Sequence, residues 1–457
     1  MMTMKALFSF CFLLSLPYSA AFQISHNPVS SRCIHRNEIT KSNIVLQAQE
    51  EPKLEDTSPI NPLVSSLTPS KTIEVHALTK ELQAKGEKIV SLCVGEPDFP
   101  PPQAVLDATI EAVQNGETKY TAVTGSLPLR SAICHDLDRR KGTIYDPADI
   151  IVGNGAKQEV YQAVLALCRP GDEVLIQAPY WTSYPEIVKL SGATPVIIDT
   201  TAAENYLLSP EKLAAAITPK TRMLIFCNPS NPTGAVHEPQ LLEKLADVLQ
   251  KPEAQHVWIC SDEIYERLVY DVEHVSFAAL EGMKDRTIVI NGFSKSHAMT
   301  GYRLGYMAAP KSVIKAVTTI QGQLTSCASS ISQAAGVAAL AVPDEELQAS
   351  IDVMKEKRDF VMERLRKIPN LQCPKPTGAF YVLPDISSYL GKKAPDGTQI
   401  NTSTDFCMYL LRQHKVALVT GEGFGSSGTV RISYAASFQE IENALDEFSG
   451  CLASLGN

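Results

Sequence analysis

The feature that most constrains the fold is a repeating alternation that begins near residue 149. Short apolar runs rich in β-branched residues alternate there with segments whose apolar residues recur at helical spacing. Such an alternation predicts a mostly parallel sheet with helices on both faces. The runs are Ile150–Val152, Val174–Ile176, Pro195–Ile198, Met223–Phe226, Val257–Cys260 and Thr287–Ile290, the last of which we expect to close the series.

The segments that flank this region predict a second, smaller domain. Helical patterns cover Thr72–Lys85 and Ala104–Gln114, and a long helical stretch from Ile314 is expected to lead out of the large domain. We therefore predict an α/β protein with a smaller α+β domain. The expected divisions are an N-terminal segment at 61–105 that packs with the small domain, a large domain at 106–330 and a small C-terminal domain at 331–457.

The composition limits the kinds of molecule that we expect this protein to bind. The chain has 457 residues and a formal net charge of −9, and an acidic protein is a poor match for nucleic acid, which binds clustered Lys and Arg. No segment is long and apolar enough to predict a membrane span. The 11 cysteines include no C-x-x-C pair and none at zinc-ligand spacing with histidine, so we expect buried reduced thiols and no metal site.

The first 60 residues read as targeting sequence. Residues 1–21 have a basic start at Lys5, a short apolar stretch and small residues before Phe22, which is typical of a signal peptide. Residues 22–60 begin with a stretch rich in Ser, Asn, Arg and His and poor in acids, like a transit peptide, and end in a linker. The combination resembles the bipartite presequences of algae with complex plastids. We expect a plastid location, favoured by the unpaired cysteines, with secretion as the alternative.

Polar residues follow the expected strands at the edge of the sheet where ligands bind in such folds. A Gly-rich turn at 153–158 opens a helix, whose free N–H groups suit a phosphate. Two Asn-Pro pairs at 228–232 make a rigid loop, and Asp262 ends a buried strand, where a carboxylate is costly without a cation. Lys295 follows the last strand, with Arg303 eight residues further on. Each feature alone is common, but together they suit a cofactor with an aldehyde, a phosphate and a pyridinium nitrogen.

At this point the chain resembles the class I aminotransferases, which use pyridoxal 5′-phosphate. The resemblance spans about residues 60–450 and its sequence words occur in the family's order. They are GEPDF (95–99), KYT (119–121), PYW (179–181), NPTG (231–234), SDEIYE (261–266), SKSHAMTGYRLGY (294–306), PTGAFY (376–381) and VRISYA (430–435). The resemblance implies the fold type I of pyridoxal-phosphate-dependent transferases, and a homodimer with shared active sites.

The resemblance also implies a role for each residue of the site. Lys295 would bind the cofactor aldehyde and move the proton at the substrate Cα. Arg431 would hold the substrate α-carboxylate, beside the Gly95 backbone. The other groups would hold the cofactor: Asp262 at the ring nitrogen, Asn231 and Tyr265 at the ring oxygen, Trp181 on the ring face, Ser294, Arg303, Gly155, Ala156 and Lys157 at the phosphate, and Tyr120 at the phosphate of the neighbouring subunit.

The same resemblance indicates a substrate class. The words PSKT (69–72) and GAKQ (155–158) are similar to those of plastid enzymes that transaminate aspartate and prephenate, in which Lys157 would meet a distal carboxylate. Thr68 stands where those enzymes have a basic residue associated with prephenate, so aspartate:2-oxoglutarate transfer is the first expectation and prephenate stays open. A further departure is Thr420-Gly421-Glu422 in place of a usual proline-glycine. Alanine or aromatic aminotransferases and lyases of the same fold remain alternatives, as does a cofactor-binding regulator.

Overall fold

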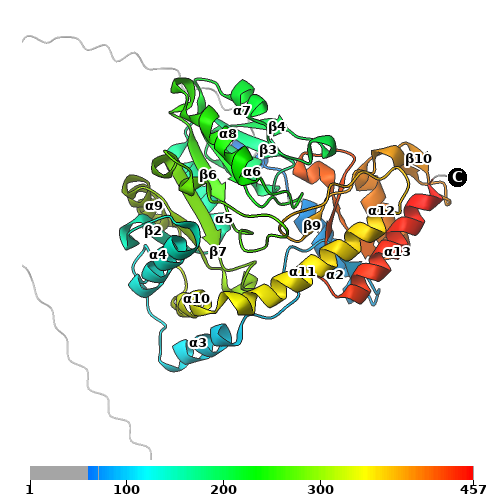
Figure 1. Cartoon of the computed structure of the whole chain (residues 1–457). Coiled ribbons are helices and arrows are strands. Elements are labelled where there is room, and N and C mark those ends of the chain that lie inside the picture. Colours follow the sequence, from blue (N-terminus) through cyan, green and yellow to red (C-terminus); the bar gives the residue numbers. More distant parts are fainter. Residues whose placement is uncertain (1–59, 70, 456–457) are drawn as a thin grey trace, which may run out of the picture. The chain divides into compact units, whose positions relative to one another are not determined.

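The computed structural model describes residues 60–69 and 71–455. The described residues belong to one compact unit, Ser58–Asn457, shown in Figure 1. The signal and transit-like segments expected at 1–60 lie outside the described residues, except for Ile60, and stay predictions.

A seven-stranded sheet forms the centre of the larger part, in the order β2-β8-β7-β6-β5-β3-β4. Strands β7, β6, β5, β3 and β4 run parallel, whereas β8 runs antiparallel to both of its neighbours, so the mostly parallel sheet is confirmed. The strands are β2 (Ile150–Gly153), β3 (Glu173–Ala178), β4 (Thr194–Asp199), β5 (Thr221–Cys227), β6 (Trp258–Asp262), β7 (Thr287–Gly292) and β8 (Gly305–Ala308).

The expectation that the run at Thr287 closes the series is wrong, because β8 follows it. Strand β8 has only four residues, begins with glycine and contains no β-branched side chain, so its sequence carries almost no strand signal. It is nevertheless completely buried between β2 and β7. Hydrogen bonding to two neighbours, rather than local propensity, sets this strand.

Helices cover both faces of the sheet because successive strand residues point to opposite sides. Helices α5 (Ala156–Leu167), α6 (Ser183–Leu190) and α9 (Lys311–Leu324) pack on the face that carries Ile176 and Ile225. The neighbouring residues Leu175 and Leu224 face the opposite layer. That layer contains α4 (Leu127–Lys141), α7 (Pro210–Ala216), α8 (Pro239–Gln250) and α10 (Ser330–Ala341).

The long helical stretch expected from Ile314 is interrupted. Helix α9 ends at Leu324, and a turn with Ser326 at φ 62° reverses the chain into α10, which Ser329 caps. Helix α10 packs back on α3 (Gln103–Gln114) and α4, and α11 (Asp344–Leu365) leads to the C-terminal part, as Figure 1 shows. An αL residue and an N-cap serine end one helix and start the next.

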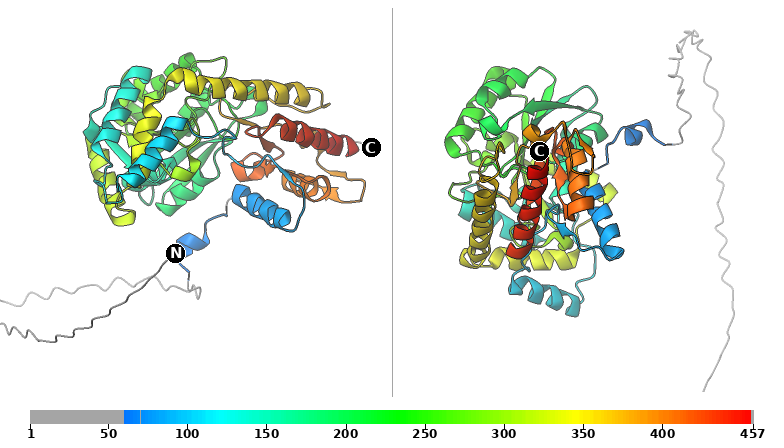
Figure 2. Two further views of the ribbon diagram at one scale, coloured as in Figure 1. Left: turned by 90° about the horizontal axis from the view of Figure 1, so that it is seen from below. Right: turned by 90° about the vertical axis from the view of Figure 1, so that its right-hand side faces the viewer.

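The C-terminal part contains a three-stranded antiparallel sheet, β13-β14-β9, covered by helices. The strands are β9 (Tyr381–Val382), β13 (Val419–Thr420) and β14 (Val430–Ser433), and the helices besides α11 are α12 (Ser403–His414) and α13 (Phe438–Ser454). Helix α2 (Lys71–Ala84) packs against β13, and β1 (Val90–Ser91) pairs with β12 (Val416–Ala417), so the N-terminal segment joins this part (Figure 2). The predicted domain boundaries themselves stay predictions.

No helix within 60–69 and 71–455 has the length and apolarity that crossing a bilayer requires. The described cysteines are all free thiols. Cys93, Cys168, Cys260, Cys407 and Cys451 are buried, as expected, and the other four are half-buried. Cys11 and Cys33 lie outside the described residues.

Candidate active site

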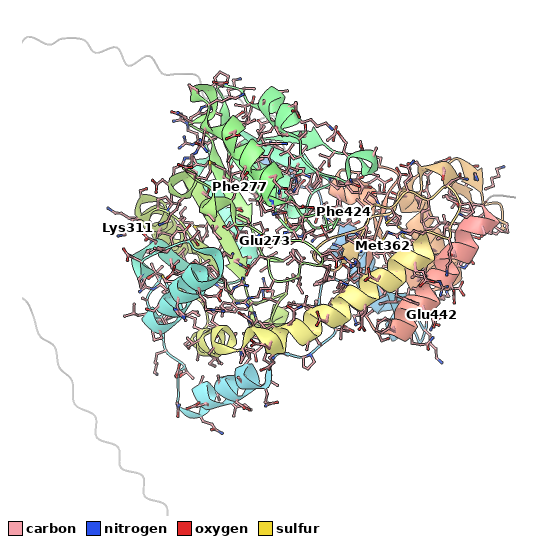
Figure 3. All side chains as sticks on the ribbon, in the orientation of Figure 1. Glu273, Phe277, Lys311, Met362, Phe424 and Glu442 are labelled. Carbon is pink, nitrogen blue, oxygen red and sulfur yellow. The ribbon has the colours of Figure 1, made fainter. Side chains whose placement is uncertain are left out.

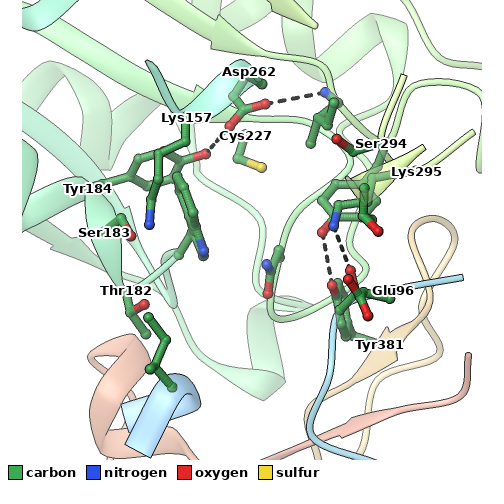
Figure 4. A pocket seen from close by; sticks show the side chains of 18 of the residues that line it. Glu96, Lys157, Thr182, Ser183, Tyr184, Cys227, Asp262, Ser294, Lys295 and Tyr381 are labelled. Atoms are coloured by element: carbon green, nitrogen blue, oxygen red, sulfur yellow. Dashed lines mark hydrogen bonds between the residues drawn. The ribbon is translucent and has the colours of Figure 1, made fainter. Parts of the chain in front are cut away.

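A cavity of about 630 Å³ opens at the edge of the sheet where the parallel strands end (Figure 4). The sequence predicts that polar groups from several strand ends converge there, and the structure brings them together. The predicted site residues that line the cavity are Gly95, Ala156, Lys157, Trp181, Asn231, Asp262, Tyr265, Ser294, Lys295, Arg303 and Arg431.

Lys295 projects into this cavity from the segment after β7. Burial lowers the pKa of its amine to about 8, with Arg431 and Arg303 acting in the same direction and Glu96 and Asp262 opposing them. The amine donates a hydrogen bond of 2.5 Å to the Gly95 carbonyl. A lysine with a pKa this low is partly neutral near neutral pH and can attack a carbonyl carbon.

Asp262 ends β6 and is 4% exposed. One carboxylate oxygen accepts a 2.6 Å hydrogen bond from the Tyr184 hydroxyl, and the other accepts from the Ile264 N–H at 3.2 Å. Burial raises the pKa of Asp262, and these two hydrogen bonds oppose the shift. A buried carboxylate facing a cavity can hold a cationic ring N–H, which would supply the positive partner that burial demands.

Tyr184 is a site residue that the sequence reasoning missed. It is 2% exposed and lies in α6, and its ring packs edge-on against Trp181 at a centroid separation of 5.3 Å. The same side chain therefore contacts both the expected ring-stacking residue and the expected partner of the ring nitrogen. Trp181 lies two residues before α6 begins, so no helical spacing links the two residues, and the sequence around Tyr184 gives no signal of its role.

The turn before α5 forms a cradle for an anion. Gly155 has φ 91°, and a Cβ there would lie 2.7 Å from the Arg303 guanidinium. Gly305 supports the cradle from behind, because a Cβ on it would lie 2.3 Å from the Ala156 nitrogen. Free N–H groups at a helix start, with an arginine and the Ser294 hydroxyl beside them, fit a phosphate group.

Arg431 lies on β14, 2% exposed, at the side of the cavity that belongs to the C-terminal part. Its two terminal nitrogens donate to the Asn231 side chain at 3.0 Å and to the Cys93 carbonyl at 2.7 Å. Its Nε is buried without a hydrogen-bond partner. The guanidinium lies over the rings of Tyr381 and Phe424, at 4.5 and 4.9 Å from their centroids. A fixed guanidinium with a free buried donor fits a carboxylate ligand.

Tyr381 is a second residue to which the sequence assigned no role. Its hydroxyl lies 2.9 Å from the Tyr265 hydroxyl, and a Cβ on Gly95 would lie 2.4 Å from it. Both tyrosines are buried, which raises the pKa of each phenol. Glycine at 95 is therefore required by this close approach. The word PTGAFY contained Tyr381, but only the fold places it beside Tyr265.

Lys157 and Tyr120 occupy different surroundings. The Lys157 amine lies 5.0 Å above the Trp181 ring at the cavity mouth, and partial burial and the neighbouring Arg303 lower its pKa. Tyr120 is 89% exposed and does not line the cavity, so within one chain the structure does not bring it to the site.

The comparisons with known proteins agree with this geometry. A sequence model of the family "Aminotransferase class I and II" matches residues 87–448. A bifunctional aspartate aminotransferase and glutamate/aspartate-prephenate aminotransferase of Petunia hybrida is 44% identical over 422 residues, which cover 91% of this chain and 87% of that protein. An aspartate aminotransferase of Pinus pinaster is 45% identical over 401 residues, covering 87% of this chain and 81% of that protein.

Solved structures show the same likeness. The aspartate aminotransferase of Rhizobium meliloti superposes with a TM-score of 0.83 at 42% identity, over 87% of this chain and all of that chain. The Thermus thermophilus enzyme with maleate superposes with a TM-score of 0.79 at 36% identity, over 86% of this chain and all of that chain. The chain therefore belongs to the class I and II aminotransferases and is an enzyme dependent on pyridoxal 5′-phosphate.

Proposed function

We propose that this enzyme moves an amino group between aspartate and 2-oxoglutarate in two half-reactions that share one cavity. The observation that carries the proposal is that two cations line that cavity besides Arg303 of the proposed phosphate cradle, namely Arg431, which is buried in its wall, and Lys157. The Lys295 amine lies in the same space. Two cations match the two carboxylates of aspartate. The relatives named as aspartate aminotransferases support the same assignment.

Pyridoxal phosphate, when bound, supplies an aldehyde that links to amines and a ring that withdraws electrons from the substrate Cα. Lys295 would hold the aldehyde through its Nζ. Once the substrate amine takes its place, the freed Nζ would accept the proton from the substrate Cα and return it to the aldehyde carbon. The lowered pKa of Lys295 suits a group that must be neutral to accept a proton.

The remaining residues would orient the cofactor. We infer that Asp262 pairs with the ring N–H, that Asn231 and Tyr265 bind the ring oxygen, and that Trp181 stacks on the ring. The phosphate would lie on the cradle formed by Ser294, Arg303 and the turn of Gly155, Ala156 and Lys157. Tyr120 would complete the cradle of a neighbouring subunit, which is why we propose a homodimer.

Prephenate is a second candidate acceptor. The Petunia hybrida relative and an aspartate/prephenate aminotransferase of Cereibacter sphaeroides, 43% identical over 394 residues, carry it in their names. Against it, Thr68 stands where the plastid enzymes that the chain resembles have a basic residue associated with prephenate. Its backbone N–H donates to the Glu186 carboxylate at 2.9 Å. For the location, a plastid reached through residues 1–60 remains our proposal, supported by the composition of that segment and by the plant relatives.

The test uses purified protein loaded with cofactor and mixed separately with aspartate, glutamate, alanine, phenylalanine and arogenate. Loss of the visible absorbance of the lysine-bound cofactor reports the first half-reaction. We expect rapid loss with aspartate and glutamate. Conversion by alanine or phenylalanine alone would contradict the dicarboxylate assignment, and ammonia or pyruvate release without amino transfer would indicate a lyase. Conversion by arogenate would establish the prephenate reaction in reverse.

A further inference from the structure

We propose that Glu422 is a positioning residue for substrate-carboxylate binding. It fixes the turn η8 (Gly421–Phe424) to the start of helix α12, and through this turn it holds Phe424 against Arg431. The inference deepens the proposed function and rests on the proposed role of Arg431. Glu422 itself does not line the cavity.

The Glu422 carboxylate accepts hydrogen bonds from four groups. The Ser403 hydroxyl donates at 2.5 Å and the Thr404 hydroxyl at 3.1 Å, both to Oε2, which also accepts from the Thr420 hydroxyl. The Ser403 backbone N–H donates to Oε1 at 3.1 Å. Ser403 and Thr404 are the first residues of α12, where the unpaired N–H groups and the helix dipole favour a negative charge. The turn is thus tied to a rigid helix end by a half-buried anion.

The sequence of the turn explains why an anchor is needed. Glycine occupies every second position, at 421, 423 and 425, and glycine loses more backbone freedom on ordering than any other residue. A Cβ on Gly421 would lie 2.0 Å from the Thr429 hydroxyl, so that glycine cannot be exchanged for a stiffer residue. Glu422 is the side chain within this glycine-rich segment that makes polar contacts with another element.

Phe424 transmits the position of the turn to the site. Its ring is fully buried, and its centroid lies 4.9 Å from the Arg431 guanidinium, which also contacts the ring of Tyr381. Its carbonyl accepts a 3.0 Å hydrogen bond from the Tyr180 N–H, directly before Trp181. Figure 3 shows Phe424 on the side of the C-terminal part that faces the central sheet. A shift of Phe424 would therefore change the ring contact of the Arg431 guanidinium. Through the Tyr180 backbone it would also displace the neighbouring Trp181.

The direct test is Glu422→Ala in the full, cofactor-loaded enzyme. We expect the KM for aspartate to rise about tenfold, because small displacements of positioning groups weaken binding steeply, while kcat changes less than about twofold. The dissociation constant of succinate, a dicarboxylate that cannot react, should rise by the same factor in calorimetry. Unfolding temperature is measured in parallel, because loss of a helix cap alone would lower it.

Glu440→Ala provides the matched control. Glu440 accepts from the Ser437 hydroxyl at 2.7 Å and from its backbone N–H at 3.1 Å at the start of α13, so it is also an acidic group that caps a helix of the C-terminal part. Neither of these hydrogen bonds involves η8. We expect this variant to lose similar stability and to keep the succinate affinity of the parent enzyme. Equal succinate affinities for both variants would overturn the proposal.

Thr420→Pro supplies a rescue that a purely structural role would not give. Thr420 has φ −63°, which is the value that proline adopts. At this point of the pairing the Gly421 N–H, and not that of Thr420, donates to the Thr429 carbonyl next to β14, so proline at 420 keeps that hydrogen bond. Proline there should stiffen the turn and recover most of the lost succinate affinity in the Glu422→Ala background. If the alanine variant does not fold, Glu422→Gln carries the test, with an expected intermediate loss. Failure of the parent enzyme to bind succinate or react with aspartate would instead refute the proposed function.

Discussion

The two sides of the cavity are built on different principles. On the sheet side, Asp262 is the last residue of β6 and Lys295 comes three residues after β7, so the backbone pairing of these two buried parallel strands brings both residues to the cavity. On the side of the C-terminal part, Arg431 also lies on a buried strand, β14, but its guanidinium is held by aromatic rings and by a glycine-rich turn that side chains hold in place. The comparison teaches that backbone pairing brings both groups to the cavity, whereas side-chain contacts orient the guanidinium of Arg431, whose position is therefore easier to change.

The largest effect is expected on the sheet side, from Lys295→Ala. Removing the amine removes both the covalent link and the group that moves the proton, so kcat should fall by at least about 10⁴-fold. Stopped-flow absorbance with aspartate measures the half-reaction, and circular dichroism checks that the fold is kept. A residual rate within about tenfold of the parent would contradict the assignment of Lys295.

The second-largest effect is expected from pH, which should change the rate at which Lys295 captures the cofactor. The pKa of Lys295 is about 8 and lies below its ordinary value, so the amine of the cofactor-free enzyme is protonated below pH 8 and neutral above it. Capture of added cofactor should therefore accelerate about tenfold per pH unit up to about pH 8 and then level off. Absorbance after mixing at a series of pH values gives this profile. A plateau reached only above about pH 10 would mean that burial does not lower the pKa of the Lys295 amine.

Lys157, on the sheet side but proposed to bind substrate, gives the next effect: Lys157→Ala should selectively weaken the reaction with aspartate. Loss of one charge-assisted hydrogen bond predicts a fall in kcat/KM of about 10- to 100-fold for aspartate. Alanine, which has no distal carboxylate, serves as the control substrate and should react as before. An equal loss for both amino acids would assign Lys157 to the cofactor phosphate rather than to the substrate.

Tyr184→Phe should give the smallest effect. It tests whether a side-chain contact, and not only the strand end, matters on the sheet side of the cavity. The hydroxyl lowers the pKa of Asp262, so its removal raises that pKa and leaves less carboxylate ionised as the pH falls. Cofactor affinity should drop about tenfold, with its acid limit shifted to higher pH. Equilibrium dialysis across the acidic range measures this. An unchanged acid limit would show that the strand end alone holds Asp262.

The sequence predicts most of the sheet and the groups at its edge, because apolar runs indicate the strands and the polar residues after these runs indicate where the strands end. It does not predict β8, which lacks such a run, or the break after Leu324, which depends on a single turn. Tyr184 and Tyr381 were missed for a different reason. Their contacts, with Asp262 and Tyr265 respectively, join segments far apart in the chain, and their own neighbours in sequence carry no sign of them. The role proposed for Tyr120 requires a second subunit and stays a prediction.

The antiparallel pairing of β7 with β8 has a consequence for how the chain can be rearranged. The chain leaves the edge of the sheet after β7 and re-enters it at β8, so one reversal carries both Lys295 and Arg303 to the cavity. New termini opened within this reversal by circular permutation would separate Lys295, the proposed covalent anchor of the cofactor, from Arg303, its proposed ionic anchor. Termini opened before β5, near exposed Lys220 on the opposite edge, would leave both in place. The segment between β7 and β8 should therefore stay uncut in a permuted enzyme that is meant to bind its cofactor.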